Sequence, residues 1–247
     1  MYFLLILSHK KSTYRDSQRT KILSQNNGKF IFYYFIGDTN LESDYLVDEP
    51  NNIVYLKVPD NYESLSLKTF HAVKFIHEKY PNIEGVFKTD DDIDLDLNKL
   101  FNLLNDNRSI KYFGTVAKST EYNSDYHFGK CESPDMNSKY IRLVDCTYCA
   151  GGGYYLSNDI IPKILNSESV FREFIFEDFA MGLALNRCGI YPIDVDVKSN
   201  GSMWISNDNH TEITFQLPQN NNVDRCYCGE IKNKRMYNFC QKCNKLY

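Results

Sequence analysis

The stretch VFKTDDDIDLDL, residues 86–97, runs from an apolar segment directly into three consecutive aspartates. Adjacent carboxylates repel one another, so such a cluster at a strand end is costly unless a cation neutralises it. Side chains alternate between the two faces of a strand, so Asp90 and Asp92 are expected to point one way and Asp91 the other. Two carboxylates at a strand end suit a hard divalent cation held together with a phosphate-bearing ligand. The alternative is a solvated acidic turn that caps the next helix, the role expected for Asp94 and Asp96.

Around this stretch, short apolar runs alternate with amphipathic segments. The pattern predicts strands at 2–7, 29–37, 53–58 and 85–88, and helices at 12–25 and 64–80. Strands that alternate with helices are typical of a mostly parallel sheet covered by helices. Ligands of such sheets bind outside the carboxyl ends of the strands, and the aspartates follow such an end.

Beyond residue 96 the order of elements changes. The sequence predicts a helix at 97–107, a strand at 111–117, an irregular polar segment at 118–145, a tight glycine turn at 151–157 that leads into a strand or helix, and a helix at 178–189. The polar segment LPQNNN, residues 217–222, reads as a linker. We therefore expect a main domain over 1–216 and a linker with a small cysteine-rich tail over 217–247.

Composition restricts the class of protein. The 247 residues carry a net charge of −4, which gives no broad electrostatic basis for binding nucleic acid. The apolar run at residues 2–7 is far shorter than the ~20 residues that span a bilayer, and it lacks the features of a signal peptide. No membrane span and a cytoplasmic location are therefore expected. The abundance of Asn, Lys, Ile and Tyr is typical of an AT-rich genome; for a viral gene, the expected compartment is the host cytoplasm.

Four stretches, in this order along the chain, match motifs of one enzyme family: DNYESLSLKT (60–69), FKTDDD (87–92), YCAGGGYYLS (148–157) and EDFAMGLALNRCGI (177–190). The chain thereby resembles the β-1,3-galactosyltransferase, β-1,3-N-acetylglucosaminyltransferase and fringe family. Upstream, Arg15, Arg19 and Thr20 are similar to a further family motif, although Lys21 stands where the family has Trp. Phe179 likewise replaces the usual Val after the Glu-Asp pair.

This resemblance implies a GT-A fold, a Rossmann-like and mostly parallel sheet with flanking helices, and inverting sugar transfer. The expected donor is a UDP-sugar, the acceptor a glycan, glycoprotein or glycolipid, and the cofactor Mn²⁺ or Mg²⁺. The resemblance places Asp90 and Asp91 at the donor and Asp92, with Asp90, at the metal. It suggests His210 as a further metal ligand. The β-1,3 linkage rests on the resemblance alone, and the sequence does not identify the donor sugar.

A single carboxylate on the acceptor side is needed to take the proton of the attacking hydroxyl. Asp178 is the candidate for this general base, and Glu177 is the fallback; capping of the helix that follows is compatible with either role. By resemblance, the glycine loop lies against the donor sugar, and the absence of side chains there permits positive φ and close backbone approach. The remaining donor-binding candidates are Gly151, Gly152, Gly153, Arg15, Arg19 and Lys68.

Two close cysteine pairs near the carboxyl end are spaced like the ligands of a small structural zinc site: Cys226, Cys228, Cys240 and Cys243. The alternatives are two disulfides or free thiols. Basic residues in the tail permit a partner, which the sequence does not identify. For the whole chain, two other functions remain open: a non-catalytic module that binds carbohydrate or nucleotide-sugar, and a metal-dependent phosphoryl-transfer enzyme acting on nucleic acid.

Overall fold

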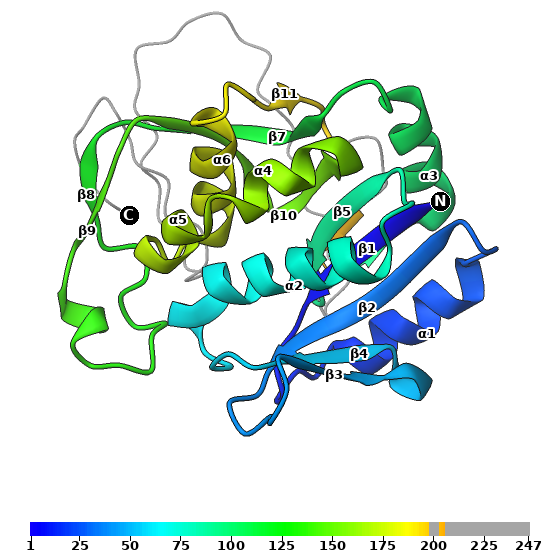
Figure 1. The fold of residues 1–247 in the computed structure, drawn as a ribbon, viewed down its shortest axis with the longest axis horizontal. Helices are drawn as coiled ribbons and strands as arrows, with labels where there is room; N and C mark the ends of the chain where they lie inside the picture. Colours follow the sequence, from blue (N-terminus) through cyan, green and yellow to red (C-terminus); the bar gives the residue numbers. More distant parts are fainter. Residues whose placement is uncertain (198–202, 206–247) are drawn as a thin grey trace, which may run out of the picture. The chain divides into compact units, whose positions relative to one another are not determined.

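The computed structural model describes residues 1–197 and the backbone of 203–205. Its centre is an eight-stranded sheet (Figure 1) with the spatial order β11 (Ile193–Asp194), β7 (Tyr112–Ser119), β10 (Cys146–Ser157), β5 (Gly85–Asp90), β1 (Tyr2–Leu7), β2 (Phe30–Gly37), β4 (Ile53–Leu56) and β3 (Tyr45–Asp48). β5, β1, β2 and β4 run parallel, while β10 and β3 are antiparallel to their neighbours. The mostly parallel sheet expected of a GT-A fold is confirmed.

Helices cover both faces of the sheet, and the sequence of β1 shows why. Phe3, Leu5 and Leu7 belong to one hydrophobic cluster, whereas Tyr2, Leu4 and Ile6 belong to the other. Because successive side chains point to opposite faces, a strand covered on both sides must be apolar throughout. The first cluster is covered by α2 (Leu65–Lys79), α4 (Ile161–Leu165), α5 (Glu168–Glu173) and α6 (Glu177–Asn186), and the second by α1 (Arg15–Gln25) and α3 (Leu97–Asp106).

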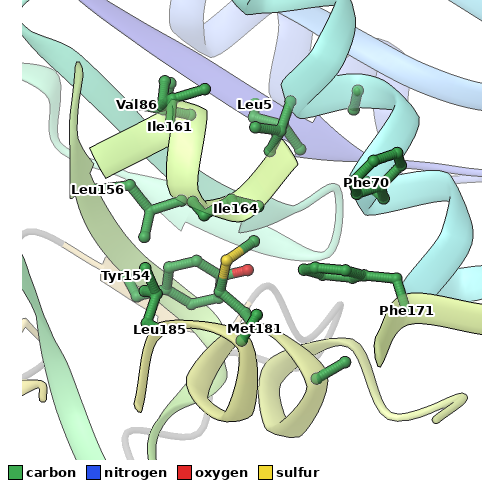
Figure 2. Close-up of a cluster of buried hydrophobic side chains, with 14 of the residues drawn as sticks. Leu5, Phe70, Val86, Tyr154, Leu156, Ile161, Ile164, Phe171, Met181 and Leu185 are labelled. Carbon is green, nitrogen blue, oxygen red and sulfur yellow. The ribbon is translucent and has the colours of Figure 1, made fainter. Parts of the chain in front are cut away.

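Figure 2 shows the larger cluster between the helices and the sheet. Phe70 of α2 and Phe171 of α5 lie together, with ring centroids 5.4 Å apart. Met181 and Leu185 of α6 lie close to Tyr154 of β10. α6 is therefore pressed against the strand that carries the glycine motif, which fixes the position of its first turn.

Smaller elements complete the fold. They are the two-stranded pairs β6 (Ile93–Leu95) with β12 (Met203–Ile205) and β8 (Tyr122–Ser124) with β9 (Ile141–Leu143), and the short 3₁₀ helices η1 (Glu49–Asn51), η2 (Tyr62–Ser64), η3 (Met136–Ser138) and η4 (Asn158–Ile160). Among the helices that the structure describes, none combines the length and the apolarity needed to cross a bilayer.

The structure corrects the sequence prediction in two segments. The segment 118–145, expected to be irregular, contains the strand pair β8–β9. The glycine turn expected at the start of 151–157 is wrong, because the glycines lie inside β10, whose register against β7 shifts between Cys149 and Tyr154. The strand expected to follow the glycines is present as the end of β10. None of the three consecutive glycines has positive φ. A strand with a bulge, rather than a turn, thus accommodates the glycines.

The order of the strands also locates a crevice. The chain moves from β1 to β2 and β4 on one side of β1, and then returns to place β5 on the other side. Ligands of open α/β sheets bind at such a reversal, outside the carboxyl ends of the strands. Leu7 at the end of β1 pairs with Asp90 at the end of β5, so the aspartate cluster lies at this point.

Gly182 allows α6 to approach β10 closely. A Cβ at Gly182 would lie 2.3 Å from the Cβ and 2.8 Å from the Cα of Tyr148, so one of the two elements would have to move. We expect Gly182→Ala to lower the free energy of unfolding by about 1–3 kcal/mol, measured by urea denaturation. Gly152→Ala is the control, because its nearest neighbour is an Ile93 carbon 3.9 Å away. Equal stability of the two variants would contradict this packing.

Candidate active site

A pocket of about 450 Å³ opens beside the carboxyl end of β5. All four sequence motifs, far apart along the chain, meet in its wall: the residues they contribute include Tyr62, Leu65, Lys88, Asp90, Tyr148, Gly151, Gly152, Glu177 and Asp178. β10 pairs with β5, and α6 packs on β10, so the sheet brings the aspartate, glycine and Glu-Asp motifs together.

Lys88 is the centre of the charged part of this pocket, and the sequence prediction did not assign it a role. Its side chain is 1% exposed. The ammonium donates to Asp90 Oδ1 at 2.8 Å, to Glu177 Oε1 at 2.5 Å and to the carbonyl oxygen of Gly151 at 2.6 Å. Burial disfavours the charge, but Asp90 and Glu177 raise the pKa of Lys88 above its ordinary value. Lys88 therefore stays charged and connects the aspartate, glycine and Glu-Asp motifs.

Glu177 is fully engaged by these neighbours. It is 4% exposed, and its second oxygen, Oε2, accepts a hydrogen bond from the Tyr154 hydroxyl at 2.9 Å. Burial raises the pKa of Glu177 to about 7, against the opposing effect of Lys88. Through its two oxygens, Glu177 thus links Lys88 of β5 to Tyr154 of β10.

Asp178, the next residue, is only half-buried and lines the pocket. Its Oδ2 accepts a hydrogen bond from the backbone of Gly151 at 3.2 Å, and its Oδ1 accepts one from Phe179 at 2.8 Å. Burial raises the pKa of Asp178 above its ordinary value. These two bonds fix the orientation of the carboxylate and leave lone pairs that can accept a proton from a ligand.

The three aspartates differ in environment. β5 ends at Asp90, so the alternation of a strand does not extend to Asp92, which lies in the following turn. Asp91 is buried and accepts a hydrogen bond from the Ser8 hydroxyl at 2.5 Å. Asp92 is half-buried, and its pKa is raised by burial and by the charges of Asp90 and Asp91.

This cluster fits a hard divalent cation. Burial is the largest cause of the raised pKa of Asp92, and repulsion from Asp90 and Asp91 adds to it; a bound cation would offset this repulsion. Carboxylate oxygens are the ligands that Mg²⁺ and Mn²⁺ prefer. Asp90 and Asp92 are the residues that could hold it. Within the described residues, no three His, Cys, Asp or Glu side chains form a complete metal site. Further ligands would come from the substrate, from water or from the rest of the chain.

The acidic residues downstream have structural roles. Asp96 caps α3, with its side chain accepting hydrogen bonds from the backbone of Asn98 and Lys99, as predicted. Asp94, expected to be solvated or capping, is 8% exposed and pairs with the ammonium of Lys21 at 2.8 Å.

The two arginine candidates lie in different surroundings. Arg15 lines a second pocket, of about 410 Å³, together with Lys10, Asp38 and Tyr55. Its guanidinium also donates to the carbonyl of His9 at 3.1 Å. Arg19 does not line either of these pockets; it donates to Asn52 Oδ1 at 3.2 Å and to the carbonyl of Pro50 at 2.6 Å.

Lys68 also lies outside both pockets. It is 2% exposed and donates to the carbonyl of Ser8 at 2.9 Å and to Asp60 Oδ1 at 2.6 Å. Asp60 in turn accepts hydrogen bonds from the backbone of Gly37 and Lys10. This pair therefore ties together the loops that leave β1 and β2, next to the aspartate cluster.

The glycine motif permits close approach without positive φ. A Cβ at Gly151 would lie 3.0 Å from Glu177 Oε1 and 3.5 Å from Asp178 Oδ2. Gly151 thus leaves room for the two carboxylates, and Gly152 borders the pocket. The expectation of positive φ was wrong, because the glycines continue a strand.

Several predictions fall outside the described residues. They concern His210, the four tail cysteines Cys226, Cys228, Cys240 and Cys243, and the domain boundary at 216. They remain predictions from the sequence.

Comparison with known proteins agrees with the motifs. The family model described as galactosyltransferase matches residues 14–196. A UDP-GalNAc:β-1,3-N-acetylgalactosaminyltransferase 1 from Mus musculus is 28% identical over 155 residues, covering 62% of this chain and 45% of the relative. The Homo sapiens protein of the same name is 33% identical over 128 residues, covering 51% and 38%. The chain thus matches less than half the length of these relatives.

Among solved structures, a glycosyltransferase involved in glycosylation of the major capsid of PBCV-1 gives a TM-score of 0.43 at 14% identity. That similarity covers 78% of this chain and 82% of the other.

Proposed function

This chain belongs to the galactosyltransferase family, and from that membership we propose that it transfers a hexose or N-acetylhexosamine from a UDP-sugar to an acceptor sugar hydroxyl with inversion. One observation carries the proposal. A half-buried, oriented carboxylate, Asp178, lines a pocket that also contains Asp90, the last residue of β5. The names of the relatives favour a β-1,3 linkage.

The crevice between β1 and β5 is the proposed binding site of the donor. The pocket with Lys10 and Arg15 lies near the carboxyl ends of β1 and β2. Lys10 pairs there with Asp38 at 3.1 Å, and the Arg15 guanidinium is the second cation beside it, a group suited to a nucleotide or its phosphates. The pocket with Asp178 lies beside the end of β5, next to the strand that follows in the sheet. We therefore place UDP across the strand ends and the donor sugar beside Asp90, Gly151 and Gly152.

Mn²⁺ or Mg²⁺ is proposed as the cofactor, held by Asp90 and Asp92. When bound, such an ion supplies positive charge that stabilises a diphosphate leaving group. The rest of the chemistry falls to residues of the chain. Lys88 orients Asp90 by a hydrogen bond from its ammonium, and Asp91 holds the turn against Ser8 by accepting a hydrogen bond from the Ser8 hydroxyl.

In the proposed reaction, the acceptor hydroxyl oxygen forms a bond to C1 of the donor sugar. The bond between C1 and the phosphate oxygen breaks, and UDP leaves with the bonding electron pair. Asp178 takes the proton of the attacking hydroxyl. We prefer Asp178 to Glu177 for this role because Glu177 is 4% exposed and bound to the Lys88 ammonium, whereas Asp178 is half-buried and accepts, within the described residues, only backbone hydrogen bonds. One displacement converts an α-linked donor into a β-linked product.

The metal assignment can be tested by binding alone. We expect Asp92→Asn to weaken Mn²⁺-dependent UDP binding by at least about 10–100-fold, a loss that is typical even of residues that only support a ligand. The fold should persist, because the substitution removes one of three repelling charges. Isothermal titration calorimetry with UDP, with and without Mn²⁺, is the measurement. Asp96→Asn is the control, since Asp96 caps α3; unchanged binding in Asp92→Asn would refute the assignment.

The function is tested by incubating the protein with a panel of UDP-sugars and Mn²⁺. Hydrolysis of the donor, or transfer from it, supports an enzyme. Binding without turnover would instead indicate a non-catalytic module, and failure to bind any UDP-sugar would reject the proposal.

A further inference from the structure

The pocket beside Asp178 has a second, aromatic half that the mechanism above does not use. Its rings come from Tyr62, Tyr122, Tyr126, Tyr148 and Phe176. Tyr122 and Tyr126 belong to the segment that contains β8 and β9, outside the four motifs, and they are 49% and 57% exposed. Exposed tyrosines at a pocket offer an apolar ring and a polar hydroxyl together, which suits the mixed surface of a pyranose.

The aromatic half faces the candidate base. Burial raises the pKa of Tyr62, and the charge of Asp178 and the hydroxyl of Tyr126 raise it further. Burial likewise raises the pKa of Tyr148, again with contributions from Asp178, Tyr122 and Tyr126. The rings and the Asp178 carboxylate line the same pocket. A sugar stacked on the rings would therefore present its hydroxyls to Asp178.

A cation also lies in this region. The ammonium of Lys130 is 3.1 Å from the ring centroid of Tyr126 and 5.6 Å from that of Tyr62. Lys130 is exposed, and no ion pair recorded within residues 1–197 includes it. The carboxylate of Glu63, the residue after Tyr62, accepts a hydrogen bond at Oε1 from the backbone of Ser133. Two aromatic faces thus position an ammonium whose hydrogen-bonding capacity remains available to an anion.

We propose that this aromatic half is the acceptor subsite and that it selects acceptor sugars carrying an anionic substituent, bound by Lys130. The inference rests on the proposed function and adds the class of acceptor to it. Carboxylate, sulfate and phosphate substituents share the chemistry that Lys130 recognises. Stacking on the aromatic rings holds the sugar in the subsite, and the ion pair with Lys130 sets its orientation.

The test compares acceptors that differ only in charge. Transfer is measured with methyl galactoside against its 6-sulfate and 6-phosphate, and with methyl glucoside against methyl glucuronide. The wild-type protein is expected to show a lower KM for at least one anionic member of these pairs. Lys130→Gln should raise that KM about tenfold or more, the loss expected for a charge-assisted hydrogen bond, while kcat and the KM of the neutral acceptor change little. Lys130→Arg should keep the preference.

Three further variants test the role of the charge and the role of the ring separately. Lys163→Gln removes an exposed lysine of α4 and should leave every KM unchanged. Tyr126→Phe keeps the ring and should retain the preference. Tyr126→Ala should raise the KM of neutral and anionic acceptors and also reduce the preference, because Lys130 loses a ring that positions it. Equal KM values for neutral and anionic acceptors in the wild-type protein, or no effect of Lys130→Gln on a preference that exists, would overturn the proposal.

Donor hydrolysis is measured in the same samples, so that failure of the acceptor assignment can be distinguished from failure of the proposed function. Turnover of the UDP-sugar without any preference for charge rejects the acceptor assignment alone. Absence of both UDP binding and donor hydrolysis rejects the proposed function, and the acceptor assignment with it.

Discussion

Asp178→Asn is expected to lower kcat for sugar transfer by about 10²–10⁴-fold, the usual loss when a general base is removed. The asparagine side-chain oxygen can still accept a hydrogen bond from Gly151 or Phe179, so the start of α6 should persist. UDP-sugar affinity should remain near the wild-type value, because the base acts on the acceptor hydroxyl. Steady-state kinetics together with calorimetric donor binding measure both quantities.

The neighbouring carboxylate supplies the control for this prediction. Glu177→Gln can keep hydrogen bonds to Lys88 and Tyr154 through its amide, and its rate should fall far less than that of Asp178→Asn. If Asp178→Asn transfers sugar at the wild-type rate, Asp178 is not the base.

The dependence of the rate on pH provides a further mark of the base. Asp178 must be deprotonated to act, and burial raises its pKa above the ordinary 3.8. The wild-type rate should therefore rise with pH across a range above that value, and Asp178→Asn should lose this acidic limb.

Lys88→Met is expected to cost about 3–5 kcal/mol in the free energy of unfolding, because it leaves buried carboxylates without their cation. Met has a similar length, so the loss reports mainly on charge. Lys21→Met is the control: Lys21 pairs with Asp94 but is 48% exposed, and such pairs contribute about 0–1 kcal/mol. Urea denaturation measures both variants. A second substitution, Glu177→Gln, should recover part of the loss in Lys88→Met, since it removes one unpaired charge.

The loss in Lys88→Met should depend on pH in a defined direction. Burial raises the pKa of Glu177 from 4.5 to about 7 in the folded protein, and removing Lys88 removes the main influence that lowers it. A carboxyl whose pKa is raised on folding stabilises the fold when protonated, and this contribution is lost as pH rises. Lys88→Met should therefore be least destabilised in acid and more so as pH rises from about 4.5 through 7. A loss below 1 kcal/mol at neutral pH would show that Lys88 is dispensable.

Sequence patterns predicted the part of the fold that depends on local information. The apolar runs of β1 and β2 and the amphipathic period of α2 are continuous, and each formed the expected element. The glycine motif misled the prediction because glycine is common in turns, whereas here the neighbouring strands β5 and β7 hold it in a sheet. The strands β8 and β9 lie in a polar segment with no clear period.

The candidate site was only partly predictable for a similar reason. Asp178 and Glu177 were both assigned from one motif, but their different environments depend on Tyr154 and Lys88, which are distant in sequence. Lys88 stood in the quoted stretch, two residues before Asp90, yet its contact with Glu177 spans 89 residues. The signal that was available is a lysine on a strand otherwise buried on both faces, since such a charge requires buried partners.

The central claim is direct transfer from a UDP-sugar with inversion, assisted by one carboxylate. It is tested most directly by the anomeric configuration of the product, read by proton NMR after reaction of a UDP-α-sugar with an acceptor. The account predicts a β-linked product from wild-type protein and little product from Asp178→Asn. An α-linked product would contradict the single displacement and the role given to Asp178.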